Sequence, residues 1–561
     1  MAHILSLPVV GHDIVYLLCT VSLGAILVHL VPYIMDSRGL RAYPGPFLAK
    51  FTDVWLGLTI FSNTWSETID NLHKKHGMSN SARHRISYLD INQLKGAFIR
   101  IGPNYVSIAD PAALPLIYGH SSGALKASFY DAFSNFEHAN IFSTRSRADH
   151  ARKRRVESQM FALKNVRSLE STTRVHFGKF MSQWDELCKC IKGSTSEGTM
   201  GSSKWTVKDG RVWFNCMIWF SFWSFDTISD LACGSPFGMI AAAKDETWVA
   251  KYPRGEVKTL EKSAFEMVKI SVINVLAAGF EINSVLGFLP SFWWPLAKWH
   301  PRIREGNAAS AKLAGLSIAS VSKRLENSDA REDMLQSLLE GRDEDGNPMG
   351  PDEVAAEALG LIIAGADTIA NTSCATVFYL GRHLDVQAKL QAELDDALAC
   401  VDSEVAPYEA VKDLPYLDAV INEVLRLHST VGAGLPRIVP EGGLNVLGQT
   451  LKEGTWVSVP LFSVHRSVEI WGENAGEFVP ERWIDMGAEP KAEMMRAFAP
   501  FSIGPRACIG RNLAIMQLHI MVATIFRRYS FVVEGDGPLL VQDSLVRKPQ
   551  ECVVGIKRRV L

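Results

Sequence analysis

Residues 501–511, FSIGPRACIGR, constrain the fold of this chain most, because they place a cysteine between two glycines just before a helical pattern. The residues that follow, Asn512 to Phe526, have the periodicity of a helix, so Cys508 should lie close to its N-terminus. Backbone N–H groups at a helix N-terminus stabilise a thiolate, and glycines leave room for a flat ligand beside it. An isolated cysteine is usually a small buried apolar residue, but this arrangement predicts a cradle in which Cys508 is a ligand.

A second motif lies within a predicted helix that starts at Pro351, where a proline and two acids occupy the first turn. This helix contains the sequence AGADT at residues 364–368, which combines small residues with the acid Asp367 and the hydroxyl of Thr368. Taken alone, Thr368 could simply donate a hydrogen bond to the preceding turn.

Two further segments carry charged residues in a fixed order. Glu423 and Arg426 in EVLR stand three positions apart on one helix face, a spacing that alone indicates only a surface ion pair. The segment FVPERW follows and supplies Arg482.

Along the chain, the order of these four segments is AGADT, EVLR, FVPERW and the cysteine loop. In this order they resemble the motifs of the cytochrome P-450 superfamily, in particular its microsomal fungal members. The resemblance covers essentially everything after the N-terminal segment. It implies a mainly α fold with a small β portion, a triangular helical prism around a buried haem. In that resemblance Cys508 is the axial ligand of the haem iron, Thr368 hydrogen-bonds the bound oxygen, and Asp367 helps to deliver protons. Glu423, Arg426 and Arg482 form a structural network whose loss should prevent haem incorporation.

The resemblance also implies which residues surround haem b. Haem carries two propionates, which need cationic donors. The expected contacts are Phe501, Gly504, Arg506 and Gly510 from the cysteine loop, Arg437, and the pair His150 and Arg154.

The implied activity is that of an O₂-dependent monooxygenase that hydroxylates a small organic substrate. Electrons should come from NADPH through a separate reductase, since the sequence contains neither a dinucleotide-binding G-x-G-x-x-G unit nor a flavin domain. Lys153, Arg154, Arg155 and Arg511 form a candidate docking patch for that reductase, or else a solvated basic face.

Several segments resemble those of fungal benzoate para-hydroxylases, which favours a benzoate-like aromatic acid as substrate. Residues 241–299 depart from that pattern, so the alternative is a tailoring oxidase that acts on a polyketide, terpene or aromatic intermediate. A haem carrier or a haem-thiolate isomerase is disfavoured by the presence of Asp367 and Thr368. The similar segments are LKASFYDAF (125–133), RSRADHARKR (145–154), GSPFGM (234–239), VHRSVEIWG (464–472) and EFVPERW (477–483).

Composition limits the possible partners. The 58 basic and 60 acidic residues give a net charge of -2, which provides no reason to expect nucleic acid as a partner. The nine cysteines show no paired zinc-type spacing and no secreted disulfide pattern, so we expect reduced thiols in a protein that faces the cytosol. Cys188 and Cys190 form only a single C-x-C.

The N-terminal segment differs from the rest. Residues 14–35 carry no formally charged side chain and are long enough to cross a bilayer core of about 30 Å. Because basic residues follow this segment, we expect a single-pass anchor in the endoplasmic reticulum membrane with a cytosolic body. The predicted division is an anchor at residues 1–36 and a catalytic domain at 37–561. Residues 288–300 are rich in tryptophan, which favours either contact with membrane lipid or a core loop.

Local patterns predict other elements of the body. We expect hairpins at 97–107 and 451–460, a surface loop at 193–203 and a buried core helix at 212–225.

Overall fold

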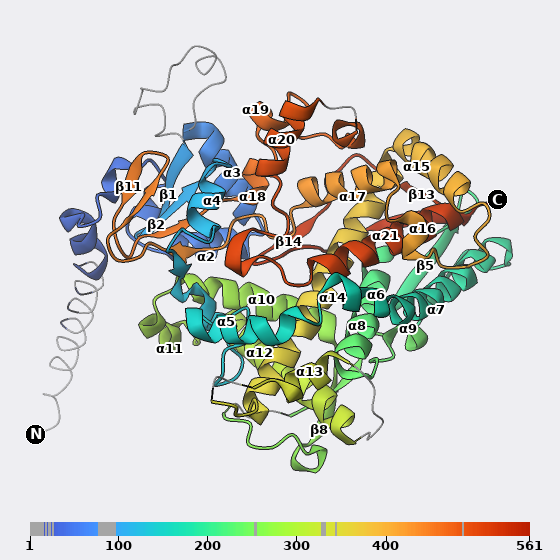
Figure 1. The fold of residues 1–561 in the computed structure, drawn as a ribbon, viewed down its shortest axis with the longest axis horizontal. Coiled ribbons are helices and arrows are strands. Elements are labelled where there is room, and N and C mark those ends of the chain that lie inside the picture. Colours follow the sequence, from blue (N-terminus) through green and yellow to red (C-terminus); the bar gives the residue numbers. More distant parts are fainter. Residues whose placement is uncertain are drawn as a thin grey trace, which may run out of the picture.

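The computed structural model describes residues 16, 20, 24, 27–76, 97–251, 255–326, 333–342, 345–484 and 487–560. This part of the chain is mainly helical, with two five-stranded sheets and three two-stranded pairs (Figure 1). The predicted fold class, mainly α with a small β portion, is confirmed.

The helix α14 (Pro351–Arg382) runs through the middle of the molecule (Figure 1). It begins as predicted, with Pro351 in its first turn followed by two acids. Most of its side chains are buried, because it packs against α8 (Cys216–Cys233), α12 (Pro301–Glu326), α17 (Pro415–His428) and α21 (Arg511–Arg528). The helix predicted after Cys508 is confirmed as α21.

Shorter helices surround this centre. α10 (Val272–Phe288) packs on α12, and α5 (Arg147–Ser158) is capped by Ser146, whose hydroxyl accepts from the N–H of Asp149. The others are α2 (Val54–Phe61), α3 (Trp65–His76), α4 (Ala113–Tyr118), α6 (Leu163–Ser168), α7 (Glu170–Lys189), α9 (Met239–Ala242), α11 (Trp294–Ala297), α13 (Met334–Glu340), α15 (Leu384–Ala397), α16 (Tyr408–Val411), α18 (Leu461–Val464), α19 (Val468–Trp471) and α20 (Ala488–Ala497). The 3₁₀ segments are η1 (Leu40–Ala42), η2 (Leu48–Lys50), η5 (Ser128–Phe133), η6 (Cys190–Lys192), η7 (Lys262–Ala264), η8 (Ser291–Trp293), η9 (Pro480–Trp483) and η10 (Gly504–Arg506).

One sheet has the order β1-β2-β12-β9-β3. Its hairpin of β1 (Phe98–Gly102) and β2 (Tyr105–Ile108) confirms the prediction for 97–107. The hairpin predicted at 451–460 is wrong, because the two strands that flank the turn at Gly454, where φ is 76°, do not pair with each other. β11 (Gln449–Leu451) pairs with β10 (Leu444–Val446), whereas β12 (Trp456–Ser458) fills the place between β2 and β9 (Arg437–Ile438). β3 (Leu125–Lys126) completes this sheet.

The second sheet has the order β13-β16-β6-β5-β4. The loop predicted at 193–203 is partly wrong, since β4 (Glu197–Met200) turns at Gly201 and pairs with β5 (Ser203–Lys208). β6 (Arg211–Asn215) occupies the first residues of the predicted core helix at 212–225, and the buried helix α8 begins only at Cys216. The remaining strands are β13 (Tyr529–Val533) and β16 (Val553–Arg558), and the pairs β7 (Thr247–Ala250) with β8 (Met267–Ile270) and β14 (Val541–Asp543) with β15 (Arg547–Pro549).

Within the described ranges, no helix combines the length and apolar character needed to span a membrane. Ten of residues 14–35 lie outside the described residues. The anchor and the division after residue 36 therefore stay predictions. Residues 27–35 are helical and contact the body. The Nδ1 of His29 is 2.8 Å from the carbonyl oxygen of Phe51, and its ring stacks on Trp293 with centroids 6.4 Å apart.

Candidate functional site

Cys508 lies in the loop between η10 and α21, and its N–H donates to the carbonyl oxygen of Phe501 at 2.8 Å. Gly504 shapes this loop, since its φ is 73° and an added Cβ would lie 2.0 Å from the carbonyl oxygen of Tyr118. The glycine at 504 therefore serves a close approach of the backbone to α4. At Gly510 an added Cβ would meet only Phe161, at 3.8 Å, so the clearance that we expected from the glycines applies to Gly510 alone.

The surroundings of Cys508 combine enclosure with positive charge. Protein atoms surround the residue, but its side chain is exposed to a cavity inside the protein. Burial raises the pKa of the thiol, while the N–H of Gly510 and the charges of Arg154 and Arg511 lower the pKa and offset part of that rise. The guanidinium of Arg511 lies 5.8 Å from the ring centroid of Phe501.

The cavity has a volume of about 390 Å³ and is bordered by Cys508 on one side and by Thr368 of α14. Its wall is mainly apolar, with Phe280 of α10 and Ile363 of α14 among the contributors. Asn283 of α10 adds a polar group, and its oxygen accepts a hydrogen bond from Ser310 at 3.1 Å. Further apolar residues in the wall are Phe133, Phe142, Leu435, Leu545 and Val546.

Five basic side chains border the same cavity: Lys126, His150, Arg154, Arg437 and Arg506. The four lysine and arginine side chains donate to neutral oxygens. Arg506 donates to the carbonyls of Thr144 and Ser146 at 3.2 and 3.1 Å, and Arg437 donates to the hydroxyl of Tyr130 at 2.7 Å. Arg154 donates to the carbonyl of Ala507 at 2.8 Å. Lys126 donates to the carbonyls of Ile141 and Phe142. The structure therefore brings together the four residues predicted from the sequence and adds a fifth, Lys126.

Burial and the neighbouring positive charges lower the pKa values of these basic groups. Burial and the charges of Arg506 and Arg437 lower the pKa of Lys126 well below its ordinary value. Burial, Arg506 and Lys126 lower the pKa of His150 to about 3, and burial together with Arg437 lowers that of Arg506 to about 10. Such a cluster attracts anions. A thiol and clustered cations around one cavity fit the iron and the two propionates of haem.

Lys126 lies outside the sequence motifs and could not be identified from them. It stands opposite Arg437 in the antiparallel pair of β3 and β9, and this pairing became visible only in the fold.

Asp367 and Thr368 lie side by side on α14 but have different surroundings. Both residues border the cavity, and the hydroxyl of Thr368 donates to the carbonyl of Ala364 at 2.8 Å. Asp367 is 1 % exposed, and its carboxylate accepts from Lys548 of β15 at 2.5 Å and from Asn371 at 3.2 Å. No sequence motif indicated Lys548, which lies 181 positions from Asp367.

Gly365 borders the cavity and also allows close packing of two helices. An added Cβ there would lie 2.6 Å from side-chain atoms of Ile228, so the glycine lets α8 approach α14. Ala364 supplies the small surface that faces the cavity.

Glu423, Arg426 and Arg482 form one buried network, as the order of their motifs suggested. The Glu423 carboxylate accepts from Arg426 at 2.7 and 2.8 Å, from Arg482 at 2.9 Å, and from the backbone of Val479 and the indole of Trp483 at 3.0 Å each. The remaining donors of the two arginines reach backbone carbonyls from residues 465 to 477. The network joins α17 to the segment that leads into η9.

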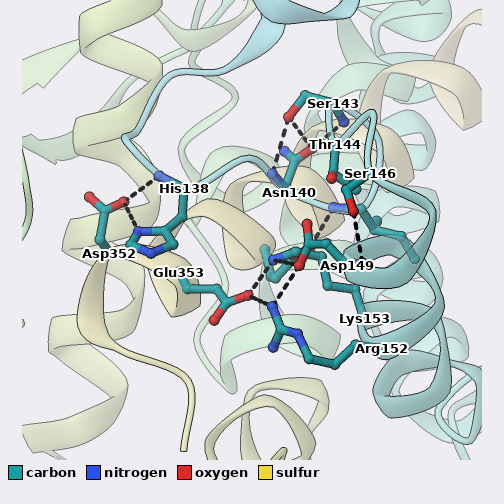
Figure 2. Close-up of polar contacts among 12 residues, drawn as sticks. His138, Asn140, Ser143, Thr144, Ser146, Asp149, Arg152, Lys153, Asp352 and Glu353 are labelled. Atoms are coloured by element: carbon teal, nitrogen blue, oxygen red, sulfur yellow. Dashed lines mark hydrogen bonds and ion pairs between the residues drawn. The ribbon is translucent and has the colours of Figure 1, made fainter. Parts of the chain in front are cut away.

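Ion pairs hold α5 against the N-terminal part of α14 (Figure 2). Lys153 is 1 % exposed and donates to Glu353 and to Glu357, in the latter case at 2.7 Å. Arg152 donates to Glu353 as well, and His138 contacts Asp352 at 2.8 and 3.0 Å. The docking patch proposed from the sequence is therefore wrong for Lys153, which is buried.

Comparison with known proteins supplies an independent line of argument. The family model described as cytochrome P-450 matches residues 116–555. Benzoate 4-monooxygenase bphA of Aspergillus niger is 37 % identical over 95 % of this chain and 96 % of its own length. Tryprostatin B 6-hydroxylase of Aspergillus fumigatus is 28 % identical over 95 % of this chain and 82 % of its own.

Proposed function

Because the chain belongs to the cytochrome P-450 family and is a haem-dependent monooxygenase, we propose that it hydroxylates a small aromatic acid of the benzoate type. The observation that carries this proposal is the 37 % identity with benzoate 4-monooxygenase over nearly the full length of both chains. The relative that is named for tryprostatin B is 28 % identical.

The cavity offers a place for such an acid. In a benzoate ring the 4-position lies opposite the carboxylate, so a substrate oxidised there must hold its carboxylate away from the oxygen-binding side. Asn283 of α10 suits that role, because Ser310 occupies its oxygen and its amide nitrogen is the group that can donate to a carboxylate. Phe280, one turn earlier on α10, borders the same cavity and can pack on the aromatic ring.

Bound haem supplies the iron that activates O₂ and transfers one of its oxygen atoms to the substrate. Thr368 has the cavity-facing hydroxyl that can donate to oxygen once it leaves the carbonyl of Ala364. Asp367 is the neighbouring acid, and its ion pair with Lys548 must loosen before its carboxyl group can pass a proton toward the cavity.

The test is a spectral titration of the haem protein with benzoate, followed by product analysis. We expect a low-to-high-spin shift and formation of 4-hydroxybenzoate. In Asn283→Leu, benzoate affinity should fall by about tenfold, the equivalent of about 1.4 kcal/mol for one lost hydrogen bond to a charged group. Asn274→Leu changes the same residue type at an exposed position of α10 and should bind benzoate as the wild type does.

A second candidate is the oxidation of a larger secondary-metabolite intermediate, which the similarity to tryprostatin B 6-hydroxylase supports. If benzoate and related acids leave the spectrum unchanged while an indole or polyketide intermediate shifts it, this candidate replaces the first. The monooxygenase activity stands in either case.

We propose that a separate NADPH-dependent reductase supplies the electrons. Arg155 of α5 and Arg511 beside the cysteine loop are exposed and can meet an acidic surface of that partner. Arg155→Glu should slow reduction of the haem by the reductase, and the difference from wild type should shrink at high salt. Equal rates at low salt would remove Arg155 from the docking surface.

We also propose that residues 14–35 anchor the protein in the endoplasmic reticulum membrane, with the body on the cytosolic side. The support is a group of exposed apolar side chains near the described end of this segment: Phe47 is 77 % exposed, Phe292 64 % and Trp299 84 %. The stacking of His29 on Trp293 brings the N-terminal helix to the tryptophan-rich residues 288–300. Fractionation of the full chain and of a chain lacking residues 1–36 tests this proposal, since only the full chain should resist extraction by salt and alkali.

A further inference from the structure

Three cysteines from distant parts of the chain meet in the interior, away from the cysteine loop. Cys216 is the first residue of α8, Cys374 lies on α14, and Cys552 directly precedes β16. Their sulfur atoms all lie within 4.8 Å of one another. The side chains are 0 %, 0 % and 4 % exposed.

The backbone holds two of these cysteines in fixed positions. The N–H of Cys216 donates to the carbonyl of Cys552 at 2.9 Å. The side-chain oxygen of Asn215 accepts from the N–H of Met217 and from that of Cys552, at 3.0 and 3.1 Å. Cys374 projects from the central helix toward this pair. The thiols are therefore placed by the start of an interior strand, the start of a helix and the central helix, not by a flexible loop.

We propose that Cys216, Cys374 and Cys552 bind one thiophilic metal ion in three-coordinate geometry, and that the ion is Cu(I). Among the described residues the candidate ligand group consists of these three sulfurs alone, with no histidine or carboxylate. Soft thiolate ligands select Cu(I) over harder cations, whereas Zn²⁺ normally takes four ligands.

The dimensions suit such an ion. With metal–sulfur bonds of about 2.3 Å, three sulfurs around one ion in a plane lie about 4.0 Å apart. The observed upper limit of 4.8 Å requires only a small inward movement of the sulfurs.

The site is distinct from the monooxygenase centre. Cys508 lies in the loop before α21 and is not part of the group. An ion bound to the three thiols would link α8, α14 and β16. We therefore expect it to stabilise the fold without serving as a reactant.

The test uses the haem-loaded full chain, expressed with added copper and, in parallel, incubated as purified protein with a Cu(I)–glutathione donor. After competition with a Cu(I) chelator, bound copper is measured by mass spectrometry. Wild type should retain one equivalent, and Cys374→Ser should retain none. Cys233→Ser is the matched control, since Cys233 is buried on the same α8 but lies outside the group, and this variant should retain copper as wild type does.

Haem content and the thermal midpoint show whether each variant folds. If Cys374→Ser does not fold, Cys216→Ser or Cys552→Ser replaces it. Copper should raise the midpoint of wild type and of Cys233→Ser, and it should leave the cluster variant unchanged. Wild type that retains no copper by either loading route, or a folded cluster variant that retains as much as wild type, would overturn the proposal.

Discussion

Replacing Glu423 by glutamine removes a charge and an acceptor from the buried network that joins α17 to η9. The shape of the side chain is preserved, so the change tests the interactions and not the packing. Five hydrogen bonds reach the carboxylate, three at Oε1 and two at Oε2. A glutamine can keep the three at Oε1 if its oxygen takes that position.

The loss of stability follows from the two donors that the amide group cannot accept from. The amide nitrogen would then face the Nε of Arg426 and the indole N–H of Trp483, which are both donors. An unsatisfied buried donor costs about 1–3 kcal/mol, and breaking a buried ion pair costs about 3–5 kcal/mol. We expect a loss of at least about 3 kcal/mol, a large part of a total stability of about 5–15 kcal/mol.

The assay compares thermal midpoint and haem content of Glu423→Gln with those of Glu481→Gln. Glu481 is on the neighbouring segment, but it is partly exposed and pairs with Lys389 and Tyr416. Its loss should cost less than about 1 kcal/mol. If both variants retain haem and melt at the same temperature, the reasoning that assigns Glu423 a structural role is refuted.

Three further substitutions test other parts of the site. Lys548→Met leaves the charge of the buried Asp367 carboxylate without its ion-pair partner, so the thermal midpoint at neutral pH should fall by the equivalent of about 3 kcal/mol. The midpoint should recover in the double variant with Asp367→Asn. An unrecovered midpoint would contradict the ion pair. Thr368→Val removes the cavity hydroxyl without changing its shape, and product formed per NADPH should fall about tenfold or more, whereas unchanged coupling would exclude a role for the hydroxyl. Burial and the nearby Glu357 raise the pKa of Glu157 well above its ordinary value, so the stability of wild type relative to Glu157→Gln should fall as the pH rises above the unfolded value of about 4.3; parallel pH curves would contradict this.

The elements that the sequence predicted correctly are those with short-range signals. The helix from Pro351 has a proline and acids in its first turn, and α21 follows the glycine of the cysteine loop. The hairpin at 98–108 likewise forms around its own turn. The network of Glu423, Arg426 and Arg482 was also predicted, because each of these residues belongs to a recognisable motif.

Features that depend on distant pairing were not predicted. Lys126 reaches the cavity through its pairing with Arg437, and Lys548 reaches Asp367 from a strand near the C-terminus. Lys153 looked like a surface cation because the residues around it are basic, but Glu353 and Glu357 of another helix enclose it. No local pattern carries such information.

The central helix explains why the site and the other buried groups can be tested separately. Successive residues of an α-helix are rotated by about 100°, so Glu357 and Thr368, eleven positions apart, lie on nearly the same face. That face meets α5 at one end and borders the cavity further along. Asp367 and Cys374, seven positions apart, share a second face, which meets Lys548 and the three thiols. Substitution of Thr368 should therefore change how oxygen and substrate are held, whereas substitution of Asp367 should change proton delivery and substitution of Cys374 should change stability.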